Sequence, residues 1–199
     1  MKALVGLCAA LILAGCGEAS QTPTEPASAP AATPVTPVTP VEYPLVEPIP
    51  PGQPGGLPDD PTPISEAPFT PTSPQGAANR MQIYFALIGE KKFDQAWELW
   101  NGEPTDQANA TGMTKAEFIA DMNRYYQYSA QVGAPGETDG AAGSIFITVP
   151  VQIYGRLKTG EVFHHRGDAT LRRVNDVDGS TERQRQWHIS KIETTPFPG

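Results

Sequence analysis

Proline is so concentrated in one part of this sequence that it divides the chain before any other feature is considered. Of the 22 prolines, seventeen fall between Pro23 and Pro74, with a near-repeat over residues 33–40. Proline lacks a backbone donor and pushes the preceding residue toward extended geometry, so neither a helix nor a sheet can propagate through such a stretch. We therefore expect residues 16–76 to form a disordered, Pro-rich linker that acts as a semi-rigid spacer.

The first residues have the pattern of an export signal that is later removed. Lys2 precedes an apolar run of about twelve residues, which suits a signal-peptide core of ~7–15 residues and is too short for a membrane span of ~20. Leu13-Ala14-Gly15-Cys16 then resembles the lipobox of bacterial lipoproteins. The resemblance implies a signal peptide over residues 1–15 and lipidation of Cys16, which attaches the mature chain to the bilayer. An ordinary signal peptide with a chance cysteine is the alternative.

Two further details of this region bear on location and chemistry. Gly17 stands where some lipoproteins carry an aspartate associated with inner-membrane retention, so the resemblance implies an exported protein on the periplasmic face of the outer membrane. The two cysteines are Cys8, inside the predicted signal, and Cys16. A lipidated Cys16 leaves the mature chain without a disulfide, a thiolate nucleophile or a cysteine metal ligand.

Charge is distributed as unevenly as proline. Between Ala3 and Asn79 there is no Lys or Arg, whereas from Arg80 onward 13 basic residues face 15 acidic ones. A nucleic-acid-binding domain needs a clustered basic face, so we expect no nucleic-acid partner. No phosphate loop, nucleophile triad or metal-ligand cluster is present in the sequence, and we expect neither a cofactor nor a metal.

From residue 77 onward the composition changes to that of one folded domain, residues 77–193, with a tail at residues 194–199. Three helices are predicted from apolar residues at helical spacing. The apolar sets are Met81, Tyr84, Phe85 and Ile88; Phe93, Ala96, Trp97 and Trp100; and Phe118, Ile119, Met122, Tyr125 and Tyr126. The third set follows Thr114-Lys115-Ala116-Glu117, which has the form of a capping box.

Beyond Tyr126 the apolar period changes to two, which predicts strands. The predicted strands cover residues 145–154, 162–174 and 184–192, with residues 127–133 as a further strand. Pro150 indicates that its strand lies at an edge or carries a bulge. The predicted fold class is therefore α+β, with three N-terminal helices packed on a curved antiparallel sheet.

Residues 77–193 resemble the nuclear transport factor 2-like (cystatin-like) superfamily. The resemblance rests on the order of elements, on the helix Lys92-Phe93-Asp94-Gln95-Ala96-Trp97 and on the closing Trp187-His188-Ile189. It implies a helix-covered, cone-shaped sheet with an apolar pocket. Different members use that pocket for catalysis, small-ligand binding or protein contact, so the fold alone does not select a function.

Four side chains are candidates for lining the pocket: Tyr84, Trp97, Tyr125 and His165. The alternative is that the aromatic residues belong to the core and that His165 is a hydrogen-bonded histidine at a rim. His165 and Asp168 are also the candidates for a catalytic acid/base pair, which requires a bulge at Gly167 to bring both to one face. The acidic loop from Asn175 to Ser180 lacks calcium ligands at both ends of the motif, so we interpret it as a hairpin turn.

The sequence thus predicts a membrane-anchored envelope lipoprotein whose globular domain binds a small ligand or a partner protein without catalysis. Its expected partners are the lipid bilayer, through acylated Cys16, and an envelope protein or small ligand. We expect Trp97, Trp100, Phe118 and Tyr125 to fill the interior of the cone. One alternative is an acid/base enzyme acting on a small apolar substrate. The other is a structural envelope spacer protein.

Overall fold

The computed structural model describes residues 42–60, 69–100, 108–141 and 143–198 of the 199-residue chain. The predicted signal peptide, the lipobox with Cys16, and the linker residues before 42 and over 61–68 lie outside these ranges. Within the described ranges, none of the helices combines the length and apolar character needed to cross a membrane.

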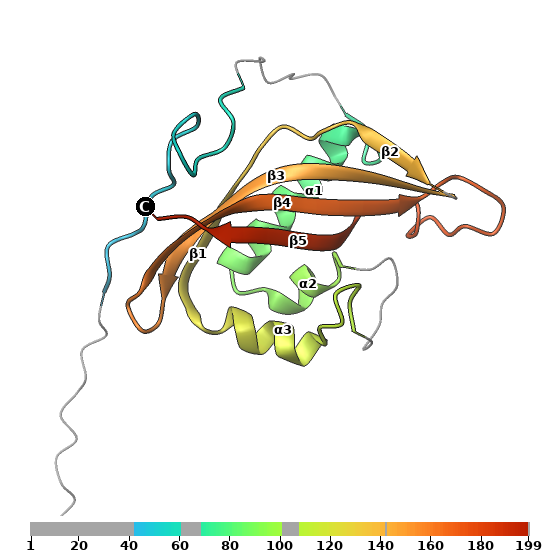
Figure 1. Ribbon diagram of the computed structural model, residues 1–199. Coiled ribbons are helices and arrows are strands. Elements are labelled where there is room, and N and C mark those ends of the chain that lie inside the picture. The colour runs from blue at the N-terminus through green and yellow to red at the C-terminus, as the bar shows by residue number, and fades with distance from the viewer. Residues whose placement is uncertain (1–41, 61–68, 101–107, 142, 199) are drawn as a thin grey trace, which may run out of the picture. The chain divides into compact units, whose positions relative to one another are not determined.

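Three helices precede the sheet, as predicted (Figure 1). Helix α1 spans Pro74–Gly89, and the hydroxyl of Ser73 caps it by accepting from the backbone N–H of Gly76 at 3.1 Å. Helix α2 is short, Phe93–Trp97, and helix α3 spans Lys115–Met122. The capping box before α3 is present in full, because Thr114 and Glu117 each accept the other's backbone N–H. This reciprocal bonding satisfies two backbone donors that would otherwise lack partners.

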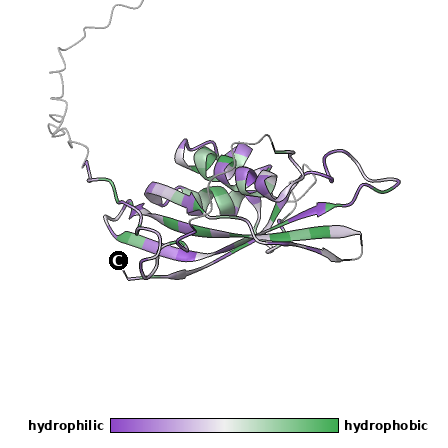
Figure 2. Ribbon diagram, turned by 90° about the horizontal axis from the view of Figure 1, so that it is seen from above, coloured by the Kyte–Doolittle hydropathy of each residue, from purple (hydrophilic) through white to green (hydrophobic). Residues whose placement is uncertain are grey.

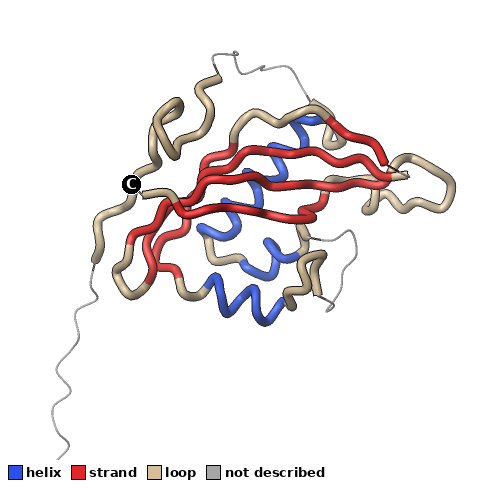
Figure 3. The backbone as a smooth tube through the Cα atoms, viewed as in Figure 1, coloured by secondary structure: helices blue, strands red, loops and turns tan. Residues whose placement is uncertain are grey.

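Five antiparallel strands form one sheet: β1 (Tyr125–Val132), β2 (Thr138–Ala141), β3 (Ser144–Leu157), β4 (Val162–Val174) and β5 (His188–Pro196). The order is β1-β3-β4-β5, and β2 pairs with the far end of β3. Strands β3 and β4 run side by side and curve along their length (Figure 3). The predicted α+β class is confirmed.

Helices lie on one face of the sheet only (Figure 2). The strand residues on this inner face are buried against the helices and form the core with them. The largest fully buried members are Trp187, Phe118, Met81, Ile147, Leu171 and Ile189. Period-two alternation in β3 and β4 produces this face, because successive strand residues point to opposite sides.

Pro150 lies neither at a sheet edge nor at a bulge in the β3–β4 pairing, the two positions predicted from its lack of an N–H. Strand β3 is central and pairs with β4 through Pro150 without a register shift. On its other side, the Pro150 carbonyl accepts from Gly133 N–H at 2.8 Å, at the point where β1 has just ended at Val132. The missing donor therefore faces a break between β1 and β2 rather than a continuous neighbour.

The predicted boundaries of the domain are too narrow at both ends. Helix α1 begins at Pro74, and residues 42–60 pack on the outer face of the sheet, the face away from the helices. Strand β5 continues beyond residue 193, since Thr194 and Pro196 pair with Gly167 and His165. Proline content alone cannot exclude such packing, because an extended segment needs no internal hydrogen bonds to lie on a sheet.

Candidate functional site

A pocket of about 280 Å³ opens beside the first strand, and we call it the β1 pocket. Its walls come from the end of α1, the start of α2, the end of α3, the start of β1 and one residue of the segment 42–60. The lining residues are Leu45, Ile88, Gly89, Lys91, Phe93, Met122, Tyr125, Tyr126, Gln127, Tyr128 and Ser129. Four consecutive positions of β1, Tyr125 to Tyr128, therefore meet side chains from all three helices.

A bulge at the start of β1 produces this arrangement. The pairing of β1 with β3 slips between Tyr125 and Gln127, which leaves Tyr126 as the extra residue. Just past the bulge, Gly155 pairs with Tyr128 and has a φ of 156°, and a Cβ there would stand 2.1 Å from the Gln127 carbonyl oxygen. Because of the extra residue, Tyr125 and Gln127 lie on opposite faces of the sheet, paired with Leu157 and Arg156, so the pocket is lined from both faces at the edge strand β1.

The aromatic rings of the pocket continue into the sheet and the core. The rings of Tyr125 and Tyr128 meet edge to face at 4.8 Å between centroids, and the Tyr125 ring meets Phe163 of β4 at 5.2 Å. Burial raises the pKa of Tyr128 well above its ordinary value, and burial with the charge of Asp121 also raises the pKa of Tyr125. Both phenols therefore stay protonated well into the alkaline range, and a protonated phenol can donate a hydrogen bond.

The other aromatic candidates lie in the core. Tyr84 is 2% exposed and Trp97 is 6% exposed, and both contact the Phe118 ring between the helices. Burial raises the pKa of the Tyr84 hydroxyl far above its ordinary value. Of the four predicted pocket residues, Tyr125 alone lines the β1 pocket, whereas Tyr84 and Trp97 lie in the core. His165 does not line this pocket either.

His165 and Asp168 do not form an acid/base pair. His165 lies on the inner face opposite Ile153, beside the Phe163 ring at 5.5 Å, and partial burial lowers its pKa. Asp168 lies on the outer face opposite Pro150 and is exposed. The required bulge at Gly167 is absent from β4, whose pairing with β3 is continuous there, so the two side chains point to opposite sides.

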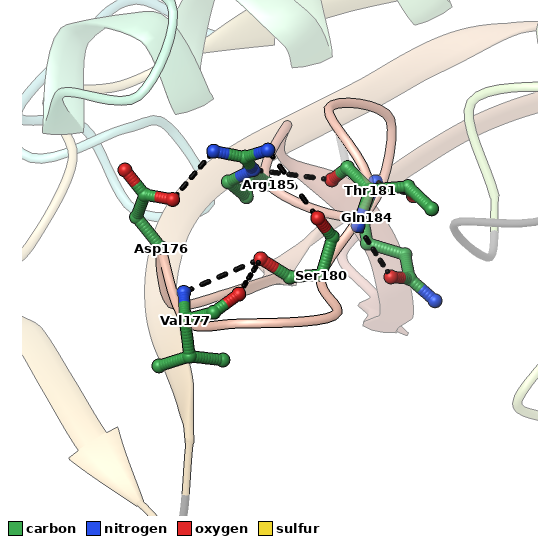
Figure 4. Close-up of polar contacts among 6 residues, drawn as sticks. All are labelled: Asp176, Val177, Ser180, Thr181, Gln184 and Arg185. Atoms are coloured by element: carbon green, nitrogen blue, oxygen red, sulfur yellow. Dashed lines mark hydrogen bonds and ion pairs between the residues drawn. The ribbon is translucent and has the colours of Figure 1, made fainter.

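Hydrogen bonds and an ion pair within the acidic loop between β4 and β5 hold its residues together (Figure 4). Arg185 forms an ion pair with Asp176 and also donates to the carbonyls of Thr181 and Ser180. The Ser180 hydroxyl bonds to the backbone of Val177 in a tight turn. Across the described residues, no group of three or more His, Cys, Asp or Glu side chains could hold a metal ion.

Most of the pocket residues, among them Tyr126, Gln127 and Leu45, were not predicted from the sequence. Tyr125 and Tyr126 were predicted to lie in the third helix, because they continue the helical spacing from Met122. The helix instead ends at Met122 with Asn123 as its C-cap, and the chain enters β1 two residues later. The run of two tyrosines directly before a polar, alternating segment was the signal for a strand at this point.

No protein-family model matches the sequence, and no curated protein matches it. Solved structures resemble part of the chain at low identity. A protein of Kribbella flavida shares 12% identity with a TM-score of 0.43, covering 61% of this chain and 89% of its own. A nuclear transport factor 2-like superfamily protein of Salmonella enterica shares 9% identity with a TM-score of 0.44, covering 63% and 92%. A hexachlorocyclohexane dehydrochlorinase of Novosphingobium barchaimii shares 13% identity with a TM-score of 0.41, covering 63% and 90%. Likeness at this level does not indicate which activity this chain has.

Proposed function

We propose that this domain is a non-catalytic binding domain that holds a small apolar or aromatic group in the β1 pocket. The observation that carries the proposal is the lining itself: aromatic and aliphatic side chains are combined with tyrosine hydroxyls, a serine, a glutamine and a lysine, and none of the lining residues is a histidine or a carboxylate. Apolar walls with a few placed polar groups are typical of ligand sites. The separation of His165 from Asp168 supports binding over acid/base chemistry.

The volume of the pocket limits the size of the ligand that it can hold. At about 280 Å³ it lies at the lower end of small-molecule pockets, which range over ~300–1,000 Å³. This volume suits a single ring or one large apolar side chain of a partner protein. The Tyr125 hydroxyl and the Lys91 ammonium would supply polar contacts, whereas the Gln127 amide already bonds to the backbone of Val46.

We further propose that the domain belongs to the nuclear transport factor 2-like superfamily and is carried by an exported lipoprotein. Three helices before a curved antiparallel sheet support the superfamily assignment. The motif Leu13-Ala14-Gly15-Cys16 supports lipidation of Cys16 and attachment to a bilayer, with the periplasmic face of the outer membrane favoured by Gly17. Metabolic labelling with a fatty acid tests the anchor, because Cys16→Ala should abolish the label.

A titration of the full-length chain with p-cresol, a one-ring phenol, tests the binding site. We expect chemical shifts of Tyr125, Tyr128 and Met122 to move together and saturate. Tyr125→Ala removes one wall of the pocket and should weaken binding about tenfold. Phe69→Ala is the matched control, since Phe69 is an exposed aromatic outside the pocket. Equal affinity in Tyr125→Ala and wild type, or shifts confined to another surface, would contradict the proposed site.

A further inference from the structure

Residues 42–60 form an extended strap on the outer face of the sheet. Its first part, residues 42–47, is mostly exposed, and we call it the light section; its Pro44 carbonyl accepts from Arg156 at 3.4 Å, and its Glu47 carbonyl lies 3.0 Å from His164 Nε2. The Tyr43 ring meets Tyr126 edge to face at 5.3 Å and lies under the Arg156 guanidinium at 5.1 Å. The backbone of Val46 bonds twice to the Gln127 side-chain amide, at 2.8 and 3.0 Å. Of the strap residues 42–47, only Tyr43 and Val46 are partly buried, so solvent reaches most of this light section.

The later part of the strap is held firmly. Gly55, Gly56 and Leu57 are buried, and the Gly55 carbonyl accepts from the fully buried Gln152 side chain at 3.2 Å. The Phe197 ring packs on Gly55 so closely that a Cβ there would stand 2.2 Å from it. This firm section fixes the strap to the domain even where the light section has lifted away.

The light section and the β1 pocket share residues. Tyr126 and Gln127 line the pocket, and they are the residues that Tyr43 and Val46 hold. Between these two contacts lies Leu45, which also lines the pocket although its side chain is 76% exposed. A bound ligand would cover apolar surface of Leu45 that water now reaches, and only while the light section is docked.

We propose that the light section of the strap, residues 42–47, is a removable wall of the β1 pocket, so that strap docking and ligand binding stabilise each other. The inference rests on the proposed function, because it concerns the same pocket. Such coupling is reciprocal: the strap strengthens ligand binding by the same factor by which the ligand strengthens strap docking. Any pull on the chain before Glu42 reaches the Tyr43 contact first, so tension on the tether would loosen this wall before the rest of the domain.

Two measurements on the full-length chain test the coupling. In the first, Tyr43→Ala should weaken p-cresol binding about fivefold, since the ligand then loses the Leu45 wall for much of the time. Tyr43→Phe, which keeps the ring, should restore wild-type affinity, and Phe69→Ala should not change it. In the second, saturating p-cresol should slow hydrogen exchange of the Val46 amide by a similar factor, because that amide donates to Gln127 only when the strap is docked.

The outcomes separate the two proposals. Suppose that Tyr43→Ala speeds hydrogen exchange of the Val46 amide but leaves the affinity for p-cresol at the wild-type value. That result would overturn the coupling and would not contradict the binding site. No p-cresol binding to wild type at the β1 pocket would overturn both. Thermal unfolding of Tyr43→Ala should match that of wild type, which would show that the variant domain is folded. Leu45→Ala should also weaken p-cresol binding, although it removes neither the Tyr43 contact nor the Val46 contact of the strap.

Discussion

The two faces of the sheet are covered in different ways. On the inner face, Phe118 of α3 and Trp187, just before β5, belong to one hydrophobic core with the buried residues of β3, β4 and β5. On the outer face, the cover is a Pro-rich strap held chiefly through backbone groups, at Val46, Glu47 and Gly55. The helices therefore contact the sheet through a hydrophobic core. The strap contacts it through separate hydrogen bonds, and Leu57 is its buried leucine.

This difference determines how each cover can be lost. A core is close-packed, so removing any part of it destabilises the whole domain. A strap attached at separate points can lift at one point while the others hold, which is local opening rather than unfolding. The β1 pocket lies where the two systems meet, since its walls include core residues and Leu45 of the strap.

The same substitution on the two faces should have unequal effects. Leu171 is fully buried on the inner face, and Leu171→Ala should lower the free energy of unfolding by about 2–5 kcal/mol. Leu57 of the strap is 7% exposed, and Leu57→Ala should cost only about 1 kcal/mol, because it removes apolar contact on the outer face and opens no cavity in the core between helices and sheet. Urea denaturation of both variants provides the measurement. Equal losses would show that the strap is part of the core.

Alkaline pH should lower the free energy of unfolding through two buried tyrosines on the inner face of the sheet. Burial raises the pKa of Tyr128 and of Tyr84 above the ordinary value of 10.0. Unfolded tyrosines ionise near that value while these two stay protonated in the fold, so stability is full below pH 10 and falls as pH rises above it. The fall is about 1.4 kcal/mol per pH unit for each such tyrosine.

Denaturation at pH 8, 10 and 11 measures this loss. Tyr128→Phe should reduce the alkaline slope, and Tyr126→Phe, at an exposed tyrosine of the same strand, is the matched control. An unchanged slope in Tyr128→Phe would mean that its hydroxyl is accessible to water in the folded protein.

A pair of glycines tests the outer face. Gly55 and Gly112 have nearly the same positive φ, 87° and 84°, but a Cβ at Gly55 would meet the Phe197 ring whereas a Cβ at Gly112 would meet nothing. Both alanine variants pay a backbone penalty of about 1 kcal/mol. Gly55→Ala should in addition release the firm section, which faster hydrogen exchange over residues 50–57 would report. Equal exchange in the two variants would contradict the packing of Phe197 on the strap.

We expect the smallest change in stability from protonation of His165 at acidic pH. Partial burial lowers its pKa from 6.5, so the unfolded state binds a proton more readily than the folded state as pH falls. This contribution to stability is complete above pH 6.5 and is lost below it. His165→Gln should flatten the slope of stability between pH 7 and 5 slightly. A slope identical to wild type would show that the imidazole is fully solvated.

The inner face was largely predictable from sequence. Helical spacing in α1 and alternation in β3 and β4 mark residues that must be buried, and the capping box at Thr114 fixes the start of α3. These signals are local, so one sequence suffices to read them. The end of α3 was wrong because Tyr125 and Tyr126 preserve the helical spacing by coincidence.

The outer face and most of the pocket were not predictable. The strap attaches through backbone carbonyls and amides, which nearly every residue carries. No pattern of side chains in the sequence therefore predicts where it attaches. Its side-chain partners, such as Gln127 and Gln152, lie about 80 to 100 residues away along the chain. The pocket lies at a bulge between Tyr125 and Gln127, and a bulge shifts the alternation on which the prediction relied.

Nuclear Overhauser contacts across the outer face test the central claim most directly, namely that residues 42–60 are a docked part of the domain. In the full-length chain we expect contacts between the Gly55 α-protons and the Phe197 ring, and between the rings of Tyr43 and Tyr126. Random-coil chemical shifts throughout residues 42–60, in a protein whose β3–β4 contacts are intact, would contradict the account.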